Sequence, residues 1–373
     1  MKILHIIDSA GIHGAETMLL TLATRQIAQG IEAAIGSIGL PGEGEKPVET
    51  QATARGIAVK PFRIKAGLNI FGALAIVRFA LKNKFTHYHC HGYKGNILLC
   101  LLPRFIRKLP VVSTLHGWTA TTPFSKIGVY VMLDKIALRF ADKVVFVNGA
   151  MATSPFFLSL GKRASVIPNG IDQPQPNEKF VPDQTIKDFC EGAFVVGSIG
   201  RLSAEKAYDQ LIQGFALFSA KHENAKLCII GEGSERGKLE QRAHDLGIRD
   251  RILLPGYYAE AWRYLPLFKI YAISSLTEGL PITLLEAMYC RVPVVSTAVG
   301  GIPDVLQNGR AGILAPVNDR QALVRGFERL YGDQSLCNQM TSAAYERVHV
   351  HFTSSTMSDQ YAEMYNGIHH GPK

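Results

Sequence analysis

Short apolar runs alternate along the chain with longer segments in which apolar residues return every three or four positions. The runs are typical of buried strands, and the longer segments are typical of amphipathic helices. In the first half we predict strands at 2–7, 33–37, 59–62, 87–91, 111–115 and 143–147, and helices at 16–29, 70–82 and 127–140. Such alternation predicts a parallel, doubly wound sheet with right-handed crossovers.

The alternation stops near Ile167 and resumes at Phe194. The segment IPNGIDQPQPNEKFVPDQ is rich in Pro, Asn and Asp, which indicates a connection between two domains. In the second half we predict strands at 194–199, 226–230, 252–254, 270–274 and 294–297, and helices at 207–221, 235–246, 283–288, 320–331, 334–349 and 355–365. The fold class is therefore α/β, with two Rossmann-like, doubly wound parallel-sheet domains and a cleft between them.

The composition excludes a disordered or fibrous chain, because 47% of the 373 residues are hydrophobic and only 19% are charged. Six cysteines are scattered without a CxxC pair and are typical of reduced core residues in a cytosolic protein. The start, MKILHIIDSAG, is too short for a secretory signal, and the apolar runs are too short to span a bilayer. We expect a protein that is soluble or lies on a surface.

The charge is unevenly distributed. Residues 1–172 contain 20 basic and 9 acidic residues, and residues 50–133 contain 12 basic residues and no acidic one. Such a field attracts anionic partners. The basic residues alternate with apolar blocks, which suits anionic lipid better than nucleic acid, because an apolar face can enter the lipid interface. The alternative is that these blocks are ordinary core helices with solvated basic ends.

Candidate binding loops follow several predicted strands, at the edge where parallel sheets bind ligands. In the loop 9–16, Gly11 and Gly14 allow close approach of the backbone to an anion, although two glycines also serve simple turns. Arg201 and Lys206 follow another strand and suit the two phosphates of a diphosphate, or else form an exposed basic turn. The turn 231–233 is a candidate contact for a nucleoside.

The segment 274–288, SSLTEGLPITLLEAM, contains the sharpest pattern. Pro281 suits the first turn of a helix, so Glu278 precedes the helix and Glu286 lies inside it. Each carboxylate can accept paired hydrogen bonds from vicinal hydroxyls, one set on a sugar and one on a ribose. The amides of 279–283 would point toward the same anionic ligand. The alternatives are a surface carboxylate for Glu286 and a loop cap for Glu278.

In combination these motifs resemble the retaining glycosyltransferases of family 4, a large bacterial family. The matching segments are 14–16, 115–117 (LHG), 167–172 (IPNGID), 200–206, 230–233 (IGEG), 278–286 and 299–305 (VGGIPDV), with an aromatic terminal helix. The spacing of Glu278 and Glu286, with its EGLP start, is the most specific. Two positions depart from the family pattern, His13 and Ala207, where glycine is usual.

The resemblance implies a GT-B fold. Residues 1–172 would bind the acceptor and residues 173–351 the nucleotide sugar, and residues 352–373 would form a helix that returns to the first domain, followed by a tail. The catalytic residues would be His116, Glu278, Arg201 and Lys206. The donor-binding residues would be Gly14, Arg201, Lys206, Gly231, Gly279, Leu280, Pro281, Ile282, Thr283 and Glu286.

The implied reaction transfers a sugar, with uridine diphosphate as the expected carrier, to a saccharide or lipid-linked saccharide acceptor, with retention of configuration. The product would belong to cell-surface polysaccharide or glycolipid synthesis. We expect a cytoplasmic protein on the inner leaflet, with no nucleic acid partner. A hydrolase or phosphorylase would need Glu278 and Glu286 opposed across one bond. A sugar-nucleotide epimerase and a non-catalytic nucleotide-sugar-binding scaffold are further alternatives.

No metal or cofactor is expected, because no Asp-x-Asp pair follows a predicted strand. His87, His89 and His91 share one face of a strand and imitate a three-histidine metal site. Polar lining of the acceptor site or plain strand packing is the interpretation we favour. We interpret His369 and His370 as part of a frayed tail.

Overall fold

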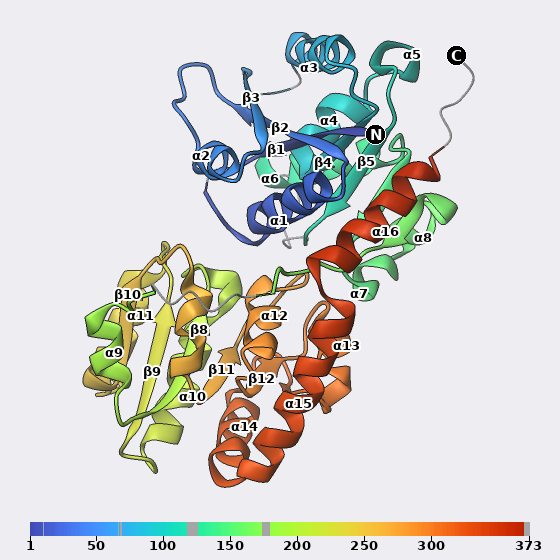
Figure 1. Ribbon diagram of the computed structural model, residues 1–373. Coiled ribbons are helices and arrows are strands. Elements are labelled where there is room, and N and C mark those ends of the chain that lie inside the picture. Colours follow the sequence, from blue (N-terminus) through green and yellow to red (C-terminus); the bar gives the residue numbers. More distant parts are fainter. Residues whose placement is uncertain (10, 66, 68, 118–125, 174–179, 369–373) are drawn as a thin grey trace. The chain divides into compact units, whose positions relative to one another are not determined.

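The computed structural model describes residues 1–373 except 10, 66, 68, 118–125, 174–179 and 369–373 (Figure 1). His369 and His370 therefore lie outside the described residues. The chain divides into two compact units. Unit 1 combines residues 1–172 with the described residues from 353 onward, and unit 2 consists of residues 173–352.

Unit 1 contains a seven-stranded sheet in the order β3-β2-β1-β4-β5-β6-β7, in which every neighbouring pair is parallel. The strands are β1 (Lys2–Asp8), β2 (Glu32–Gly39), β3 (Ala58–Arg63), β4 (His87–His91), β5 (Val111–Leu115), β6 (Lys143–Phe146) and β7 (Ala164–Val166). The parallel sheet is confirmed. The strand order changes direction between β1 and β4, which is the switch point where such sheets bind ligands.

Helices cover both faces of this sheet (Figure 1). The helices α3 (Ile70–Lys82), α4 (Tyr93–Cys100) and α6 (Lys126–Leu138) pack with Leu4, Ile6, Tyr88 and Cys90 in one core. The helices α1 (Gly14–Ala28) and α2 (Pro47–Ala54) pack with Ile7 and Ile35 in another. Shorter helices are α5 (Arg104–Arg107), α7 (Gly149–Ala152) and α8 (Pro155–Leu158). Because side chains alternate along a strand, His5 and the odd-numbered histidines of β4 face the α1 side.

The final helix, α16 (Ser354–Asn366), packs beside α1 within unit 1 (Figure 1). The amide of Ser354 donates to the carbonyl of Ile171 at 2.8 Å, and Ile171 pairs with Thr353 in an isolated parallel bridge. The Tyr361 and Tyr365 side chains of α16 are fully buried against the sheet. These contacts join the end of the chain to the first domain.

Unit 2 contains a six-stranded, all-parallel sheet in the order β10-β9-β8-β11-β12-β13. Its strands are β8 (Phe194–Ile199), β9 (Ala225–Ile230), β10 (Ile252–Gly256), β11 (Ile270–Ile273), β12 (Val294–Thr297) and β13 (Ile313–Ala315). Its main helices are α9 (Gln184–Cys190), α10 (Tyr208–Ser219), α11 (Arg236–Asp245), α12 (Ile282–Tyr289), α14 (Arg320–Gly332) and α15 (Gln334–His351). The switch point lies between β8 and β11.

All six cysteines are free, and five of them are buried, which confirms their core positions. Among the described residues, no helix combines the length and apolar character needed to cross a membrane.

We predict that Gly170→Ala destabilises unit 1, because a Cβ at residue 170 would lie 2.2 Å from the backbone oxygen of Thr353. Overpacking of this kind costs about 1–3 kcal/mol, measurable by urea unfolding. Gly149→Ala is the control, since a Cβ there meets no atom within 4 Å. Equal stabilities for the two variants would contradict the tight join between residue 170 and the start of α16.

Candidate functional site

Three strands of unit 2 end in loops that meet at the switch point of the sheet. Lys206, in the loop after β8, donates from Nζ to Oε1 of Glu278, in the loop after β11, at 2.6 Å. The Ser275 hydroxyl donates to the same oxygen at 2.6 Å. The two charged side chains are 24% and 10% exposed, so the ion pair lies at the rim of the protein interior. Removing one partner would leave a poorly solvated charge.

Backbone contacts hold these two loops together. The hydroxyl of Ser274 donates to the carbonyl of Lys206 at 2.8 Å, and the amide of Leu276 donates to the carbonyl of Glu205 at 2.8 Å. The hydroxyl of Thr297, at the end of β12, donates to the carbonyl of Ser275 at 2.7 Å. The position of the Lys206–Glu278 pair is therefore fixed by the sheet itself.

Glycines permit the close packing of neighbouring strand ends. A Cβ at Gly231 would lie 1.9 Å from the carbonyl oxygen of Gly200, and one at Gly233 would lie 2.2 Å from that of Leu202. Sequence reasoning assigned Gly231 to nucleoside contact. Within the described chain, packing against Gly200 already requires the absence of a side chain there.

The segment after β12 supports the Glu278 loop from its other side. The amide of Gly301 donates to the carbonyl of Gly279 at 2.9 Å. Gly300 has a φ of +55°, and a Cβ there would lie 2.0 Å from the Glu278 carbonyl oxygen. The VGGIPDV motif thus shapes the Glu278 loop through its backbone.

Ala207 adopts a left-handed conformation, with φ +48° and ψ 40°, at the junction between Lys206 and α10. A residue with a Cβ pays an energetic penalty there, which explains why glycine is usual in the family pattern. The same conformation explains why α10 begins at Tyr208 and not at the predicted residue 207.

The helix α12 begins at Ile282, with Pro281 as its N-cap residue and no side-chain cap. Leu280 and Ile282 are buried, and Pro281 and Thr283 line a small pocket together with Lys206 and Glu278. Thus five predicted site residues come together in unit 2: Lys206, Glu278, Pro281, Thr283 and the neighbouring Ile282.

Glu286 lies inside α12, and its side chain is half-buried. Burial raises the pKa of its carboxyl group to about 7. A carboxyl group that must ionise in a poorly solvated position is a common feature of binding and catalytic sites. The predicted separation of Glu278 in the loop and Glu286 in the helix is confirmed.

Sequence reasoning missed two tyrosines that line this pocket, Tyr208 and Tyr271. Both tyrosines are buried. Burial raises the pKa of Tyr271 well above its usual value, and the neighbouring Tyr208, Glu286 and Glu278 raise it further. It also missed Ser275. The pair Ser274-Ser275 directly at a predicted strand end was the available signal.

Arg201 is the most accessible of the predicted donor-site cations. Its side chain is 52% exposed and donates to Glu205 at 2.5 Å, an interaction between residues four apart. An exposed pair of this kind contributes little to stability, so the guanidinium can exchange Glu205 for a ligand at small cost.

Two predicted site residues, Gly14 and His116, belong to unit 1. Gly14 begins α1, and a Cβ there meets no atom within 4 Å, so packing among the described residues does not require glycine. The preceding His13 donates its amide to Oε2 of Glu16 at 3.0 Å, so this carboxylate caps the start of the helix and complements its dipole.

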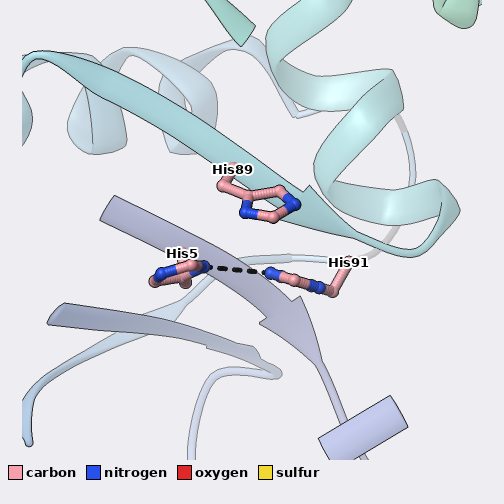
Figure 2. Close-up of side chains that lie close together, drawn as sticks. All are labelled: His5, His89 and His91. Atoms are coloured by element: carbon pink, nitrogen blue, oxygen red, sulfur yellow. Dashed lines mark hydrogen bonds between the residues drawn. The ribbon is translucent and has the colours of Figure 1, made fainter. Parts of the chain in front are cut away.

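Histidines form a chain of hydrogen bonds beneath the carboxyl edge of the first sheet. His5 Nδ1 lies 3.0 Å from His91 Nε2, as Figure 2 shows, and His91 Nδ1 lies 3.2 Å from His116 Nε2. Burial lowers the pKa of His5 and of His116 to about 4, and burial together with the neighbouring histidines lowers that of His91 well below its usual value. These imidazoles are therefore neutral at physiological pH.

His89 lies beside this chain but has other partners. Its Nε2 is 2.7 Å from the Thr114 hydroxyl, and its Nδ1 is 2.6 Å from the Tyr365 hydroxyl of α16. The metal-like group among the described residues consists of His5, His89 and His91, with one nitrogen of each within 4.8 Å of the others (Figure 2). His87, which the sequence placed in such a group, is not part of it.

These three histidines do not fit a resident metal. All six of their ring nitrogens already have hydrogen-bond partners within the protein. A bound ion would have to break several of these bonds in a fully buried place. The structure therefore favours strand packing and polar lining, as the sequence indicated, over a metal centre.

His116 itself follows β5 at the carboxyl edge of the sheet. Its Nδ1 is shielded from solvent and has no hydrogen-bond partner among the described residues. A buried polar atom without a partner costs about 1–3 kcal/mol. Such an atom in a native protein calls for an explanation, such as a water or a ligand.

Solved structures share this fold along almost the whole chain. The Anabaena protein HepE in complex with UDP-glucose has a TM-score of 0.81 and 23% identity, over 98% of this chain and 99% of that one. Sucrose-phosphate synthase from Thermosynechococcus elongatus has a TM-score of 0.77 and 18% identity, over 98% of each chain. The fold is therefore GT-B, the architecture of a large class of glycosyltransferases.

Sequence comparisons give the family. Residues 12–173 match the model of Glycosyltransferase Family 4, and residues 183–347 match that of Glycosyl transferases group 1. Lipopolysaccharide core biosynthesis glycosyltransferase LpsE of Rhizobium meliloti is 27% identical over 94% of this chain and 95% of its own. N-acetyl-alpha-D-glucosaminyl L-malate synthase of Bacillus anthracis is 28% identical over 70% of this chain and 68% of its own. The chain belongs to glycosyltransferase family 4.

We predict that Glu286→Gln stabilises unit 2 at pH 8 but not at pH 4. The pKa of Glu286 is about 7 in the folded protein and 4.5 in the unfolded chain. The contribution of Glu286 to the free energy of unfolding is therefore complete below pH 4.5 and is lost as the pH rises through 7. Glutamine avoids that loss, which we expect to be about 1–2 kcal/mol after allowance for the partial exposure of Glu286. Urea unfolding at both pH values measures the difference.

Glu346→Gln, at an exposed position of α15, is the matched control. An equal effect of Glu286→Gln at both pH values would contradict the raised pKa of Glu286.

Proposed function

We propose that the protein is a retaining glycosyltransferase that moves a sugar from a nucleotide diphosphate, with UDP as carrier, to a saccharide or lipid-linked saccharide. The observation that carries the proposal is the Lys206–Glu278 pair at the switch point of the second sheet, beside the start of α12. It offers a cation for phosphate and a carboxylate for sugar hydroxyls within 2.6 Å of each other.

The donor accounts for the other charged groups of unit 2. Lys206 and Arg201 would hold the diphosphate, and the amides at the start of α12 would add to their field. Glu278 would accept hydrogen bonds from the sugar, and Glu286 would accept them from the ribose. The ribose hydroxyls would replace water around Glu286 and favour its ionised form.

Catalysis would rest on stabilising the leaving diphosphate. As the glycosidic bond breaks, negative charge would grow on the phosphate oxygen, and Lys206 and Arg201 would stabilise it. The same phosphate oxygen would take the proton of the attacking hydroxyl, so that the new bond forms on the face that the diphosphate leaves. These steps use no metal ion.

Relatives support the class of substrates. HepE was solved with UDP-glucose, and a related Escherichia coli enzyme is named a UDP-Gal:alpha-D-GlcNAc-diphosphoundecaprenol alpha-1,3-galactosyltransferase, 24% identical over 78% of each chain. A UDP-sugar donor and a lipid-linked acceptor are therefore our first choices. The acceptor would bind unit 1 near His116, and the meeting of the two substrates between the domains stays a prediction.

The test is incubation of the full chain with UDP-, GDP- and ADP-sugars, with and without lipid extract and without added metal. Nucleotide release from one donor, increased by lipid, with the α-configured sugar found on a new product, supports a retaining transferase. Epimerised donor without acceptor identifies an epimerase instead. Tight nucleotide binding without turnover on any acceptor identifies the non-catalytic scaffold.

We predict that Lys206→Ala lowers turnover about 10²–10³-fold, because it removes a preorganised charge at the leaving group. The initial rate with saturating donor measures this loss. Lys238→Ala is the control, since Lys238 also pairs with a glutamate in unit 2, at 2.9 Å, but is 76% exposed. Near wild-type turnover in Lys206→Ala would contradict the assignment of Lys206 to the leaving diphosphate.

We also propose that unit 1 docks on the anionic inner leaflet of the cell membrane, through the outer face of α6. Val129, Met132 and Ile136 of α6, with Phe140 just after its end, recur every three or four residues, and each is 43–57% exposed. Its inner face packs against α4, where Asn96 donates to the buried Asp134 at 2.8 Å. The neighbouring Lys135 and Arg139 are cationic and complement anionic lipid, in a domain with 20 basic and 9 acidic residues.

We predict that Met132→Glu with Ile136→Glu abolishes most sedimentation with phosphatidylglycerol vesicles, because the glutamates add both polarity and repulsion. Binding of the wild type should fall steeply as salt is raised. Val350→Glu, at a residue 56% exposed on α15 of unit 2, is the control. Unchanged sedimentation of the double variant would contradict a lipid-binding surface on α6. So would a double variant whose only change is the loss of a dimer.

A further inference from the structure

The hydrogen bonds of the histidine chain run in one direction from Gln26. The carboxamide oxygen of Gln26, in α1, accepts from His5 Nε2 at 2.8 Å, which places the proton of neutral His5 on Nε2. His5 Nδ1 must then accept from His91 Nε2, and His91 Nδ1 must accept from His116 Nε2. The chain ends with the proton of His116 on Nε2 and a lone pair on Nδ1.

A second branch of hydrogen bonds joins Gln26 to α16. The amide nitrogen of Gln26 is 3.5 Å from the hydroxyl of Tyr365 and donates to it. That hydroxyl in turn donates to Nδ1 of His89 at 2.6 Å, and His89 Nε2 then donates to Thr114 at 2.7 Å. This second branch is compatible with a Gln26 carboxamide whose oxygen faces His5.

Figure 2 shows His5 on β1 and His91 on β4 facing each other across the switch point of the first sheet. His5 lies in the middle of β1, His91 is the last residue of β4, and His116 lies directly beyond the end of β5. His91 is the link between them. The free lone pair of His116 lies at the edge where parallel sheets bind ligands, and Nδ1 has no partner among the residues that the structure describes.

We propose that His5 and His91 are positioning residues that hold His116 with its proton on Nε2, so that Nδ1 accepts a hydrogen bond from a hydroxyl of the sugar substrate. This inference rests on the proposed function. The inference adds that only one tautomer of His116 can accept this hydrogen bond at Nδ1, and that Gln26 begins the chain that selects it. No proton is transferred in this role, since the phosphate oxygen of the donor takes the proton of the attacking hydroxyl.

The direct test is the nitrogen spectrum of the full-length protein with ¹⁵N-labelled histidine. Couplings between the ring nitrogens and the carbon-bound ring protons report which nitrogen carries the proton, and His116→Gln identifies the His116 signals by their loss. We expect Nε2–H for His116 in the wild type. Nδ1–H, or signals of a metal-bound imidazole, would overturn the proposal.

Variants at residue 91 separate positioning from packing. His91→Phe fills the space but removes the acceptor for His116, so we expect a mixture of tautomers and a loss in turnover of about tenfold, as for other imidazoles that lose an orienting partner. His91→Asn keeps an acceptor oxygen near the place of Nδ1 and should restore the Nε2–H tautomer and most of the turnover.

His89→Phe is the matched control, because it removes another buried histidine of β4 that bonds Thr114 and Tyr365 rather than His116. It should leave the His116 tautomer unchanged. Equal losses of turnover in His89→Phe and His91→Phe, with one unchanged His116 tautomer, would reject the proposal. A wild-type protein that transfers no sugar would contradict the proposed function. The histidine spectra test the hydrogen-bond chain separately, because they do not depend on enzyme activity.

Discussion

The ion pair between Lys206 and Glu278 depends on the parallel topology of the second sheet. The two residues are 72 positions apart in the sequence, yet their loops leave the same edge of neighbouring strands β8 and β11. Serines and backbone carbonyls then fix both loops, so the fold itself holds the two side chains together. A ligand that replaces Lys206 on Glu278 must supply both an anion and hydroxyl groups, which is the chemistry of a diphosphate sugar.

In the first sheet the main constraint is the burial of several histidine side chains. One face of β4 carries three histidines, and a buried imidazole is costly unless it is neutral and hydrogen-bonded. Partners come from β1, from β5 and from Tyr365 of α16, the last described helix of the chain. The return of the chain to unit 1 therefore completes the polar interior of that unit.

Strand and helix periodicity predicted both sheets, and the Glu278–Glu286 spacing predicted the loop-and-helix arrangement of the site. Shorter elements such as β13 and α9 were missed, because few residues carry their pattern. The turn at 231–233 suggested a nucleoside contact for Gly231. Its close packing against Gly200 could not be predicted, because that contact depends on the pairing of β8 with β9. The partnership of His5 with His91 depends likewise on the register of β1 against β4, which residue spacing alone does not determine.

The central claim is that the donor binds at the carboxyl ends of β8, β9 and β11 and opens the Lys206–Glu278 pair. A crystal structure of the full chain with a UDP-sugar tests it most directly. The account predicts the diphosphate on Lys206 and Arg201, sugar hydroxyls on Glu278, and an Nζ–Oε1 distance well above 2.6 Å. An intact pair with the nucleotide bound elsewhere, such as in the hollow at the amino ends of β1, β2 and β3, would contradict it.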